Sequence, residues 1–495
     1  MTSLWLDRAS TIPTDTFEPG AHYDVVIVGA GLTGLTSAVL LTRAGRSVAV
    51  LEARTVGAVT TGNTTAKLSL LQGSHLQGIR RRSGRAVARA YVDANRAGFD
   101  WMLRYADENG IAVQRRPSTS FALTMSGRST VQREFDVARD LGLPVEHGTP
   151  EALPMRTYDG VTLPDQAQFD PLDVLTTMTA EVRAGGGVVV EDVRVTAATS
   201  HHDPVRVATD RGDVAASTVV VATGMPVLDR GLYWAKVAPS RSYAAAFRVP
   251  GQIPAGMYLS VDSPTRSLRT APDADGGEVL VVGGNGHEVG RADSPAALMA
   301  DLTLWTTTHW PDAHLTHTWS AQDYSSPYGV PYTGWMPRGS GRIYVATGYD
   351  KWGMTNAVQS ALRLTADLTG VEQAEWGQAL GRRRTTVPAL ASLIGTNAAV
   401  GWWYLKGWAE VMTSRLPAER PAEGTGVTGM ADGKPSAEST VDQSTCRVSA
   451  VCPHLGATLR WNDLERSWDC PAHGSRFTAD GTRLEGPAAR DLTRR

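Results

Sequence analysis

Apolar residues 23–28 form a short run typical of a buried strand, and they lead directly into the sequence Gly-Ala-Gly-Leu-Thr-Gly at 29–34. An alanine- and leucine-rich stretch with helical periodicity follows and ends near Gly45. A second apolar run at 47–51 ends in Glu52. This order of strand, glycine turn, helix and strand predicts the first unit of a doubly wound parallel sheet.

Further apolar runs along the chain predict strands, and stretches with helical periodicity lie between them. The expected strands cover residues 187–190, 218–221, 278–282 and 342–345, and the expected helices cover residues 85–109 and 172–184. Strands that alternate with helices in this way are typical of α/β architecture.

The character of the sequence changes at residue 417. Residues 417–426 are rich in proline, glycine and glutamate and poor in apolar side chains, which is typical of a linker or a domain edge. From there to residue 495, short runs are separated by Gly, Asp, Asn and Pro at the spacing of small antiparallel β modules. Because 495 residues exceed what one compact core holds, two or three folding units are expected.

Composition restricts the partners of the chain. Hydrophobic residues at 42%, charged residues at 20% and a net charge of -2 are typical of a soluble globular protein and give no electrostatic attraction to nucleic acid or to an anionic membrane. Residues 1–20 lack a basic stretch followed by an apolar one, so we expect a cytoplasmic protein. No run of about 18 apolar residues occurs, so no transmembrane segment is expected. The most apolar stretch, residues 397–416, is expected to be an amphipathic helix packed on the body, with contact to a membrane surface as the alternative.

The glycine turn has the spacing of a dinucleotide-binding site. Gly29 permits a tight turn, Gly31 lets the backbone approach a pyrophosphate, and Gly34 lets the helix pack closely on the strand. The start of the helix then presents N–H groups to the anion. Glu52 stands at the end of the next strand, where a carboxylate accepts hydrogen bonds from ribose hydroxyls. A purely structural glycine turn is the alternative, but strand, helix and acidic residue together favour a dinucleotide.

Two later strands end in similar glycine corners. Residues 220–224 read Val-Val-Ala-Thr-Gly, and residues 344–348 read Tyr-Val-Ala-Thr-Gly. The second corner continues through residues 349–356 into a helix, whose N-terminus is able to stabilise negative charge on a reduced flavin ring. These corners favour FAD over NAD as the bound dinucleotide.

All three cysteines lie after residue 440, so a disulfide framework is excluded for the body. Cys452 and His454 form one short motif, Cys470 and His473 form a second, and 15 residues separate His454 from Cys470. Two such loops match the Rieske pattern, in which two thiolates hold one iron and two imidazoles hold the other. A mononuclear zinc site built from the same four ligands is the alternative. Cys446 has no place in this scheme and is expected to be a buried apolar side chain.

Together, the glycine turn, the strand corners and the two Cys–His loops resemble those of known flavoproteins. From about residue 3 to residue 370 the chain resembles the D-amino-acid oxidase-like family, which includes glycine oxidase, sarcosine oxidase and gamma-glutamylputrescine oxidase. More narrowly, it resembles members of that family that carry a C-terminal Rieske 2Fe-2S domain. The resemblance implies two cofactors, FAD and a Rieske-type 2Fe-2S cluster. It also implies non-covalent FAD, because cysteine is absent from the body and Ala66 stands where some relatives have a histidine.

The resemblance also assigns site residues. Lys67, Tyr324 and Trp352 are expected closest to the reacting atoms, with Lys67 near flavin N5. The expected cluster ligands are Cys452, His454, Cys470 and His473. The residues expected to bind FAD are Gly29, Gly31, Leu32, Thr33, Gly34, Glu52, Ala53, Thr61, Thr65, Ala66, Lys67, Ala222, Thr223, Gly224, Gly348, Trp352, Gly353, Met354 and Thr355.

The implied fold class is an α/β FAD-binding Rossmann-like domain with an interleaved antiparallel β-sheet substrate domain, followed by a small all-β Rieske domain. The body is expected to cover residues 1–390. Within it, the FAD-binding segments are expected at about 1–110, 165–240 and 318–390, and the substrate-domain segments at about 110–165 and 240–318. A helix and linker at 391–420 then lead to the Rieske domain at 421–495.

FAD accepts two electrons at once and a 2Fe-2S cluster accepts one, so their pairing indicates a dehydrogenase that hands single electrons to an external acceptor. The family chemistry implied is oxidation of a C–N bond in a small amine or amino acid. An electron-acceptor protein or a quinone is the expected redox partner. Candidates for contacting the substrate are Arg266, Arg269, Tyr258, His287, Tyr324 and Tyr332.

Three other functions fit parts of the sequence. An NAD(P)H- or carrier-linked flavin/iron-sulfur reductase would supply electrons to a partner protein, but no second glycine fingerprint follows a strand. An electron carrier without a substrate of its own is the second alternative. A Rieske oxygenase would need a mononuclear iron site in a large domain after the Rieske module, yet only 22 residues follow His473.

Overall fold

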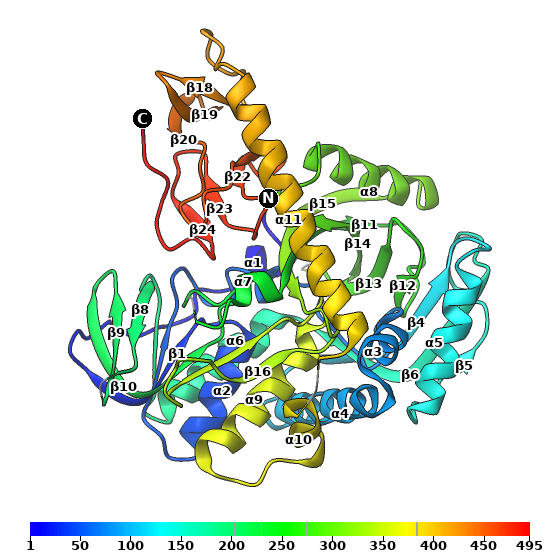
Figure 1. Cartoon of the computed structure of the whole chain (residues 1–495). Helices are drawn as coiled ribbons and strands as arrows, with labels where there is room; N and C mark the ends of the chain where they lie inside the picture. The colour runs from blue at the N-terminus through cyan, green and yellow to red at the C-terminus, as the bar shows by residue number, and fades with distance from the viewer. Residues whose placement is uncertain (202, 229, 274–275, 383–384) are drawn as a thin grey trace.

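Two large β-sheets with surrounding helices form the body, and a small β domain sits on one side of it (Figure 1). The computed structural model describes residues 1–201, 203–228, 230–273, 276–382 and 385–495. The predicted fold class is confirmed, because a mostly parallel sheet, a mostly antiparallel sheet and a separate small β domain are all present.

The first sheet has the strand order β16-β17-β10-β1-β2-β7, and β8 and β9 extend it beside β10. Its strands are β1 (His22–Val28), β2 (Val48–Leu51), β7 (Val188–Val190), β8 (Val195–Thr199), β9 (Val205–Thr209), β10 (Gly212–Val221), β16 (Tyr332–Trp335) and β17 (Ile343–Thr347). Strands β17, β10, β1, β2 and β7 run parallel, so their carboxyl ends meet at one edge. The predicted strands at 187–190, 218–221 and 342–345 are therefore confirmed as β7, β10 and β17.

The second sheet has the order β15-β11-β14-β13-β12-β4-β6-β3, and β5 pairs with β6. Its strands are β3 (Lys67–Leu68), β4 (Val113–Ala122), β5 (Glu146–His147), β6 (Asp159–Phe169), β11 (Ala238–Arg248), β12 (Met257–Ser260), β13 (Arg266–Pro272), β14 (Glu278–Glu288) and β15 (His314–Ser325). The apolar run at 278–282 is part of β14 and therefore belongs to this sheet. Both neighbours of β14, which are β11 and β13, pair with it antiparallel. The domain boundaries predicted at 165 and 318 fall inside β6 and β15.

Helices cover both sheets. They are α1 (Leu4–Arg8), α2 (Leu32–Arg43), α3 (His75–Ser83), α4 (Arg85–Glu108), α5 (Arg128–Asp140), α6 (Pro171–Ala184), α7 (Tyr233–Lys236), α8 (Pro295–His309), α9 (Gly353–Thr369) and α10 (Glu375–Gly381), and η1 (Thr61–Asn63) is a short 3-10 turn. The helices predicted at 85–109 and 172–184 are confirmed as α4 and α6.

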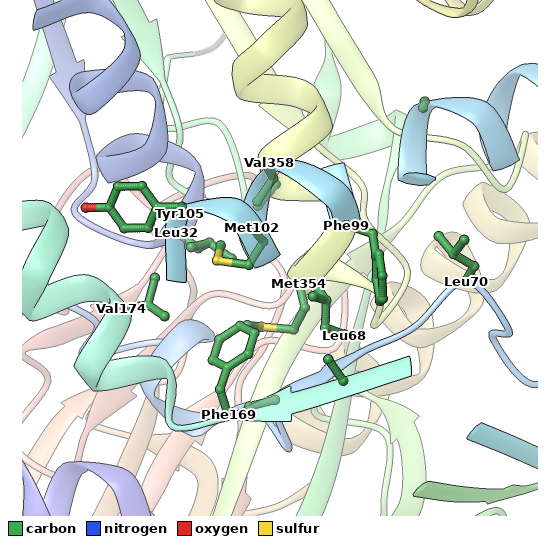
Figure 2. Packing of buried hydrophobic residues seen from close by; sticks show 14 of the residues in the cluster. Leu32, Leu68, Leu70, Phe99, Met102, Tyr105, Phe169, Val174, Met354 and Val358 are labelled. Atoms are coloured by element: carbon green, nitrogen blue, oxygen red, sulfur yellow. The ribbon is translucent and has the colours of Figure 1, made fainter. Parts of the chain in front are cut away.

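A buried apolar core joins the two halves of the body. Figure 2 shows Phe169 of β6 and Leu68 of β3 beside Met354 of α9, with Phe99 and Met102 of α4 close by. These side chains come from the second sheet, from α4 and from α9, and α9 also packs on β16 and β17 of the first sheet. Removing such residues from water is the main source of stability here, and it fixes the two sheets relative to each other.

The C-terminal domain has two small antiparallel sheets. They are formed by β18 (Gly426–Ala431), β19 (Lys434–Val441) and β20 (Ser444–Ser449), and by β21 (Arg460–Asn462), β22 (Ser467–Asp469), β23 (Arg476–Thr478) and β24 (Arg483–Glu485). Helix α11 (Val387–Thr413) connects the body to this domain. It begins before the predicted residue 397, because Thr386 caps it through a hydrogen bond from the Ala389 N–H and Pro388 suits its first turn. Within the described part of the chain, no helix is both long enough and apolar enough to span a bilayer.

A buried carboxyl group caps α3. Both oxygens of Glu134, on α5, accept backbone hydrogen bonds, at 3.1 Å from the Leu76 N–H and 3.0 Å from the Gln77 N–H. Burial raises the pKa of Glu134 to about 7, although the two N–H donors act in the opposite direction. The ionised carboxylate is therefore disfavoured in the folded state, and its burial costs stability at neutral pH.

We expect Glu134→Gln to change how stability depends on pH. Because the folded pKa lies above the unfolded value, the wild-type protein is favoured below about pH 4.5 and loses this advantage as pH rises through 7. The glutamine side chain of the variant stays neutral throughout. The difference in free energy of unfolding between wild type and variant should shift by about 3 kcal/mol between pH 4 and pH 8, measured by urea titration. Parallel pH profiles for the two proteins would contradict the raised pKa.

Candidate functional site

A cavity of about 690 Å³ lies between the two sheets, at the carboxyl ends of the parallel strands. Ligands bind in this crevice in open α/β sheets. Of the residues expected at the flavin, those that line the cavity are Gly29, Gly31, Leu32, Thr33, Glu52, Ala53, Thr61, Thr65, Lys67, Ala222, Thr223, Gly224, Tyr324, Trp352, Gly353 and Met354. The sequence pattern and the fold thus bring most of the predicted residues to one place.

The glycine turn between β1 and α2 has room only for glycine. Gly29 has a φ of +108°, and a Cβ atom there would lie 2.8 Å from the Ala222 carbonyl oxygen. A Cβ atom at Gly34 would lie 1.9 Å from the Gly29 carbonyl oxygen. Gly31 is the N-cap of α2, so the helix start points into the cavity. This close packing and the N–H groups of the helix start suit a pyrophosphate.

Glu52 follows β2 and holds the turn in shape. One of its carboxylate oxygens accepts a hydrogen bond from the Ala30 N–H at 2.9 Å, and the other accepts one from the Arg54 N–H at 2.9 Å. Burial raises the pKa of Glu52, and the two N–H donors counteract this. Its carboxylate lines the cavity beside the glycine turn, where the sequence predicts contact with a ribose.

Four residues expected at FAD lie behind the cavity wall. The Thr355 hydroxyl donates to Asn95 Oδ1 at 2.5 Å inside the core. Ala66 is fully buried with a φ of +50°, and Gly348 faces Ser326 of the body. These three residues and Gly34 pack behind the wall. None of the four lines the cavity, so their predicted contact with the cofactor is not seen.

Lys67, Tyr324 and Trp352 face the cavity from three different elements. The Lys67 side-chain nitrogen donates to the Tyr258 carbonyl at 2.8 Å and to the Ser267 hydroxyl at 2.6 Å. Burial lowers the pKa of Lys67 well below its usual value, and the nearby Arg269 adds to this effect. Trp352 is the N-cap of α9, and the Tyr324 ring lies against Gly224.

The residues proposed to contact the substrate from the second domain have structural partners instead. Arg266 is paired with Asp301 at 2.6 Å, and Arg269 donates to the carbonyls of Thr65 and Ala66. Neither guanidinium lines the cavity. The prediction that they bind a substrate carboxylate there is therefore wrong for this geometry.

The aromatic candidates Tyr258, His287 and Tyr332 also lie outside the lining. Tyr258 packs edge-on against Phe121, and His287 stacks on Tyr243 with ring centroids 5.5 Å apart. Tyr332 pairs with the edge of β17. Tyr324 alone among the predicted substrate aromatics lines the described cavity.

Several cavity residues were given no role in a site by the sequence, and Arg82 was expected to lie on a solvated face. They are His75, Arg82, Asp323, Asp350 and Lys351. Asp350 and Lys351 both have positive φ angles, of 50° and 69°, just before Trp352. The Lys351 N–H donates to Asp323, whose pKa is raised by burial to about 6. One indication of these cavity residues was visible in the sequence, which is that Asp350 and Lys351 stand directly before the predicted helix that is now α9.

The two Cys–His loops come together where the C-terminal domain meets the body. Cys452 and Cys470 are buried, and the rings of His454 and His473 are 5.1 Å apart in an edge-to-face arrangement. Trp234 of the body packs against both rings, with centroid distances of 5.7 Å and 4.9 Å.

His473 carries the clearest sign of a metal site. Both of its ring nitrogens are buried without a hydrogen-bond partner among the described residues. Unpaired buried imidazole nitrogens are costly unless they bind a metal. The donor set of two thiolates and two imidazoles therefore fits a Rieske cluster.

The C-terminal domain contacts the flavin cavity directly. The Gln322 amide, on β15, donates to the Tyr324 hydroxyl at 2.9 Å and to the Gly474 carbonyl at 2.8 Å. Gly474 follows His473 in the second Cys–His loop. Leu484, Glu485 and Gly486 also line the cavity, so the domain closes part of its wall.

A buried ion network fixes this contact. Arg241 of β11 donates to Glu465 at 2.5 Å, and Arg476 pairs with Glu465 at 2.7 Å, with Glu485 at 3.0 Å and with Asp469 at 3.0 Å. The two guanidinium groups hold the pKa of Glu465 well below its usual range. Because Arg241 belongs to the body and the other four residues to the C-terminal domain, the network crosses their interface.

A second contact holds the loop that carries Cys470 and His473. Arg291 donates to the Pro471 carbonyl at 3.0 Å. Asp463 accepts from the Ser294 hydroxyl at 2.6 Å and from the Ala296 N–H at 2.9 Å, at the start of α8. The segment of the body between β14 and α8 thus binds the C-terminal domain on both sides of β22.

Comparison with known proteins defines the class. Residues 24–368 match the model of the FAD dependent oxidoreductase family (DAO), and residues 422–494 match the Rieske [2Fe-2S] domain. The chain belongs to this FAD-dependent oxidoreductase family and carries a C-terminal Rieske domain, so its cofactors are FAD and a 2Fe-2S cluster. The Rieske match decides against the mononuclear zinc alternative.

Among known proteins, the chain is similar over nearly its whole length to the Rieske 2Fe-2S iron-sulfur protein YhfW of Bacillus subtilis, with 30% identity over 95% of this chain and 92% of the relative. Its fold is similar to glycine oxidase from Geobacillus kaustophilus, with a TM-score of 0.60 and 20% identity over 72% of this chain and 96% of that one. It is equally similar in fold to L-proline dehydrogenase from P. horikoshii, with a TM-score of 0.60 and 18% identity over 74% and 100% of the two chains.

We expect Gly34→Ala to weaken FAD binding roughly tenfold to a hundredfold. The new methyl group would lie 1.9 Å from the Gly29 carbonyl oxygen, so either the turn or α2 must move. FAD content after dialysis, read from flavin absorbance, measures the effect. Gly395→Ala is the control, because a Cβ atom there meets nothing within 4 Å. Equal FAD retention in both variants would show that the close approach does not matter.

Proposed function

We propose that this protein oxidises a C–N bond of a small amine or amino acid and that the electrons pass by way of FAD and the Rieske cluster to an external acceptor. When bound, FAD supplies a two-electron acceptor and the cluster a one-electron carrier. The observation that supports this most strongly is Gln322, because its one amide contacts both the cavity residue Tyr324 and the cluster loop at Gly474. The similarity in fold to glycine oxidase and L-proline dehydrogenase supports the substrate class.

The side chains predicted to be catalytic have distinct tasks in this proposal. Lys67 is held by Tyr258 and Ser267, so its amine stays at a fixed place in the cavity wall. Trp352 begins α9 and directs the helix start toward the cavity. Tyr324 separates the cavity from the cluster loop and is fixed through its hydroxyl by Gln322. Positioning of this kind holds the substrate and excludes water from the reacting atoms.

Arg82 is our candidate for binding a substrate carboxylate. It lines the cavity, is half-buried, and its side chain donates to the carbonyl of Gly78 in its own helix at 3.2 Å. No ion pair with a described carboxylate uses its guanidinium within 4.0 Å. Burial lowers the pKa of Arg82, and the nearby Arg81 adds to this effect, while the Asp350 carboxylate offsets it only in part. A carboxylate bound there would form charge-assisted hydrogen bonds.

We expect Arg82→Met to raise KM for an amino-acid substrate about tenfold to a hundredfold, because a hydrogen bond to a charged group contributes about 1.5–3 kcal/mol. The rate of flavin reduction at saturating substrate should change far less. Arg89→Met is the matched control, since Arg89 lies on the outside of α4 and pairs with Asp93. A KM that rises equally for the substrate and for its decarboxylated amine would rule out carboxylate binding by Arg82.

Anaerobic titration of the purified protein with a panel of amines and amino acids tests the proposed function. Flavin absorbance follows the first electron acceptor, and the EPR signal of the cluster follows the second. Bleaching by an amine with a growing Rieske signal supports the proposal and identifies the substrate class. If only NAD(P)H reduces both centres, the protein is a reductase. If neither the amines nor NAD(P)H bleaches the flavin, the protein is an electron carrier without a substrate of its own.

A further inference from the structure

The Rieske domain reaches the flavin cavity with one short segment, residues 484–486. This segment contains the end of β24 and the residue that follows it, and all three of its residues line the cavity. In Figure 1, β24, in red, lies on the side of the C-terminal domain that faces the body. A Cβ atom at Gly486 would lie 3.7 Å from the Val227 side chain, which is ordinary van der Waals contact. The segment therefore packs on the body at the cavity itself.

Contacts around Glu52 show which end of the cavity this segment reaches. The Val193 N–H donates to the Glu52 carbonyl at 2.8 Å, so the chain after β7 lies against the acidic residue that is expected to bind a ribose. Burial raises the pKa of Glu52, and the nearby Arg194 guanidinium is among the groups that offset this. Burial lowers the pKa of Arg483 in β24 to about 10, and the same Arg194 adds to this effect. Arg194 thus lies close to both Glu52 and Arg483, which places β24 at the Glu52 end.

The side chains at this end suit the adenosine group of FAD. With the pyrophosphate at the glycine turn and a ribose at Glu52, the adenine ring extends away from the flavin and toward this end. Adenine is a flat ring, and rings of this kind bind among apolar side chains. The apolar residues that line this part of the cavity are Val193, Val195 and Val227 of the body and Leu484 of the Rieske domain.

The position of residues 484–486 depends on docking of the domain. Glu485 pairs with Arg476 of its own domain at 3.0 Å and with Arg241 of the body at 3.5 Å. Leu484 and Glu485 are adjacent, so separation of the domain from the body would break the pair with Arg241 and withdraw Leu484 from the cavity. The contact of Asp463 with the start of α8 supports the same docked arrangement from outside the cavity.

We propose that residues 484–486 cover the adenosine end of bound FAD, so that the Rieske domain is part of the FAD-binding site. FAD release then proceeds mainly from molecules in which the domain has separated from the body. Because binding free energies are reciprocal, bound FAD in turn holds the domain in its docked position. This inference depends neither on the substrate nor on the route of the electrons, so it and the proposed function can fail separately.

The rate at which the full-length holoprotein releases FAD tests the proposal without any turnover. The protein is diluted into buffer without FAD, and retained flavin is measured by absorbance after filtration at successive times. Leu484→Ala should release FAD roughly threefold to tenfold faster, because it removes apolar contact from the adenosine end. Leu304→Ala is the matched control, since Leu304 on α8 is 67% exposed and is absent from the described cavity lining.

A second variant loosens docking without changing the cavity. In the double variant Asp463→Ala, Glu465→Gln, both altered residues hold the domain to the body, and neither belongs to the described cavity lining. It should release FAD tenfold or more faster, because the separated state becomes more populated. Asp442→Asn is its control, since Asp442 is 87% exposed and pairs with Arg466 of its own domain.

Hydrogen exchange of the FAD-free full-length protein identifies the end that is covered. ADP carries the adenosine half of FAD, and FMN carries the flavin half. ADP should slow exchange in residues 483–488, and FMN should slow it much less.

Three results would overturn the proposal. They are equal FAD release by Leu484→Ala and its control, equal release by the double variant and its control, and protection of residues 483–488 by ADP that does not exceed protection by FMN. The EPR signal of the cluster confirms that the Rieske domain of each variant is folded.

Discussion

Replacement of Cys470 by serine is expected to abolish the cluster EPR signal and to lower electron delivery to an external one-electron acceptor by roughly a hundredfold or more. The Cys470 thiol is buried, and a serine hydroxyl is a poor ligand for iron in this site. Reduction of the flavin by substrate should persist, because its cavity is formed mainly by the body. Iron content, EPR and stopped-flow flavin absorbance measure the three parts of this result.

Cys446→Ser is the matched control for this experiment. Cys446 is half-buried in β20, away from both Cys–His loops, and its replacement should leave the iron content and the acceptor rate unchanged. Loss of iron in this variant, or retention of the cluster after Cys470→Ser, would contradict the ligand assignment. An acceptor rate that survives loss of the cluster would mean that electrons leave the flavin by another route.

The second large effect is expected at the ion network between the body and the Rieske domain. Glu465→Gln leaves Arg241 and Arg476 buried with less negative charge between them. Breaking one partner of a buried ion network typically costs about 3–5 kcal/mol. We therefore expect a lower unfolding midpoint in urea. Asp469 and Arg476 of the network flank the second Cys–His loop. On the proposed electron path, loosening that loop should slow electron transfer from flavin to cluster in stopped-flow measurements.

Asp442→Asn provides the control, since Asp442 is 87% exposed and pairs with Arg466 at the surface. Exposed pairs of this kind contribute at most about 1 kcal/mol. The arginines lower the pKa of Glu465, so its stabilising charge is present above the unfolded value near 4.5 and is lost only as pH falls below it. The difference in free energy of unfolding between wild type and Glu465→Gln should therefore stay constant from about pH 6 to about pH 8. A difference that disappears within that range would contradict an ionised Glu465.

The cofactor classes could be predicted from the sequence because their chemistry is local. The turn at Gly29–Gly34 needs backbone conformations and close contacts that only glycine provides, and these needs are visible in the spacing. The two Cys–His loops carry their ligands within a few residues of one another. Strand and helix periodicity likewise located α4, α6, β7, β10 and β17.

Residue roles in the substrate half could not be predicted in the same way. Arg266 and Arg269 are as polar as Arg82, and nothing near them in the sequence shows that Asp301 and backbone carbonyls occupy their guanidinium groups. Arg82 reaches the cavity because α3 packs beside it. The partners of a charged side chain come from distant segments, so its availability for a ligand depends on the folded arrangement.

The sequence by itself was enough to identify the glycine turn, the two Cys–His loops and the α/β class, since each depends on residue type and short spacing. Only the tertiary structure decided that Leu484, Glu485 and Gly486 of the Rieske domain line the flavin cavity, that Gln322 contacts both sites, and that the outer face of α11 is apolar. The physical reason is that burial, pairing and exposure are properties of the surroundings of a residue, and long-range packing of the chain creates those surroundings.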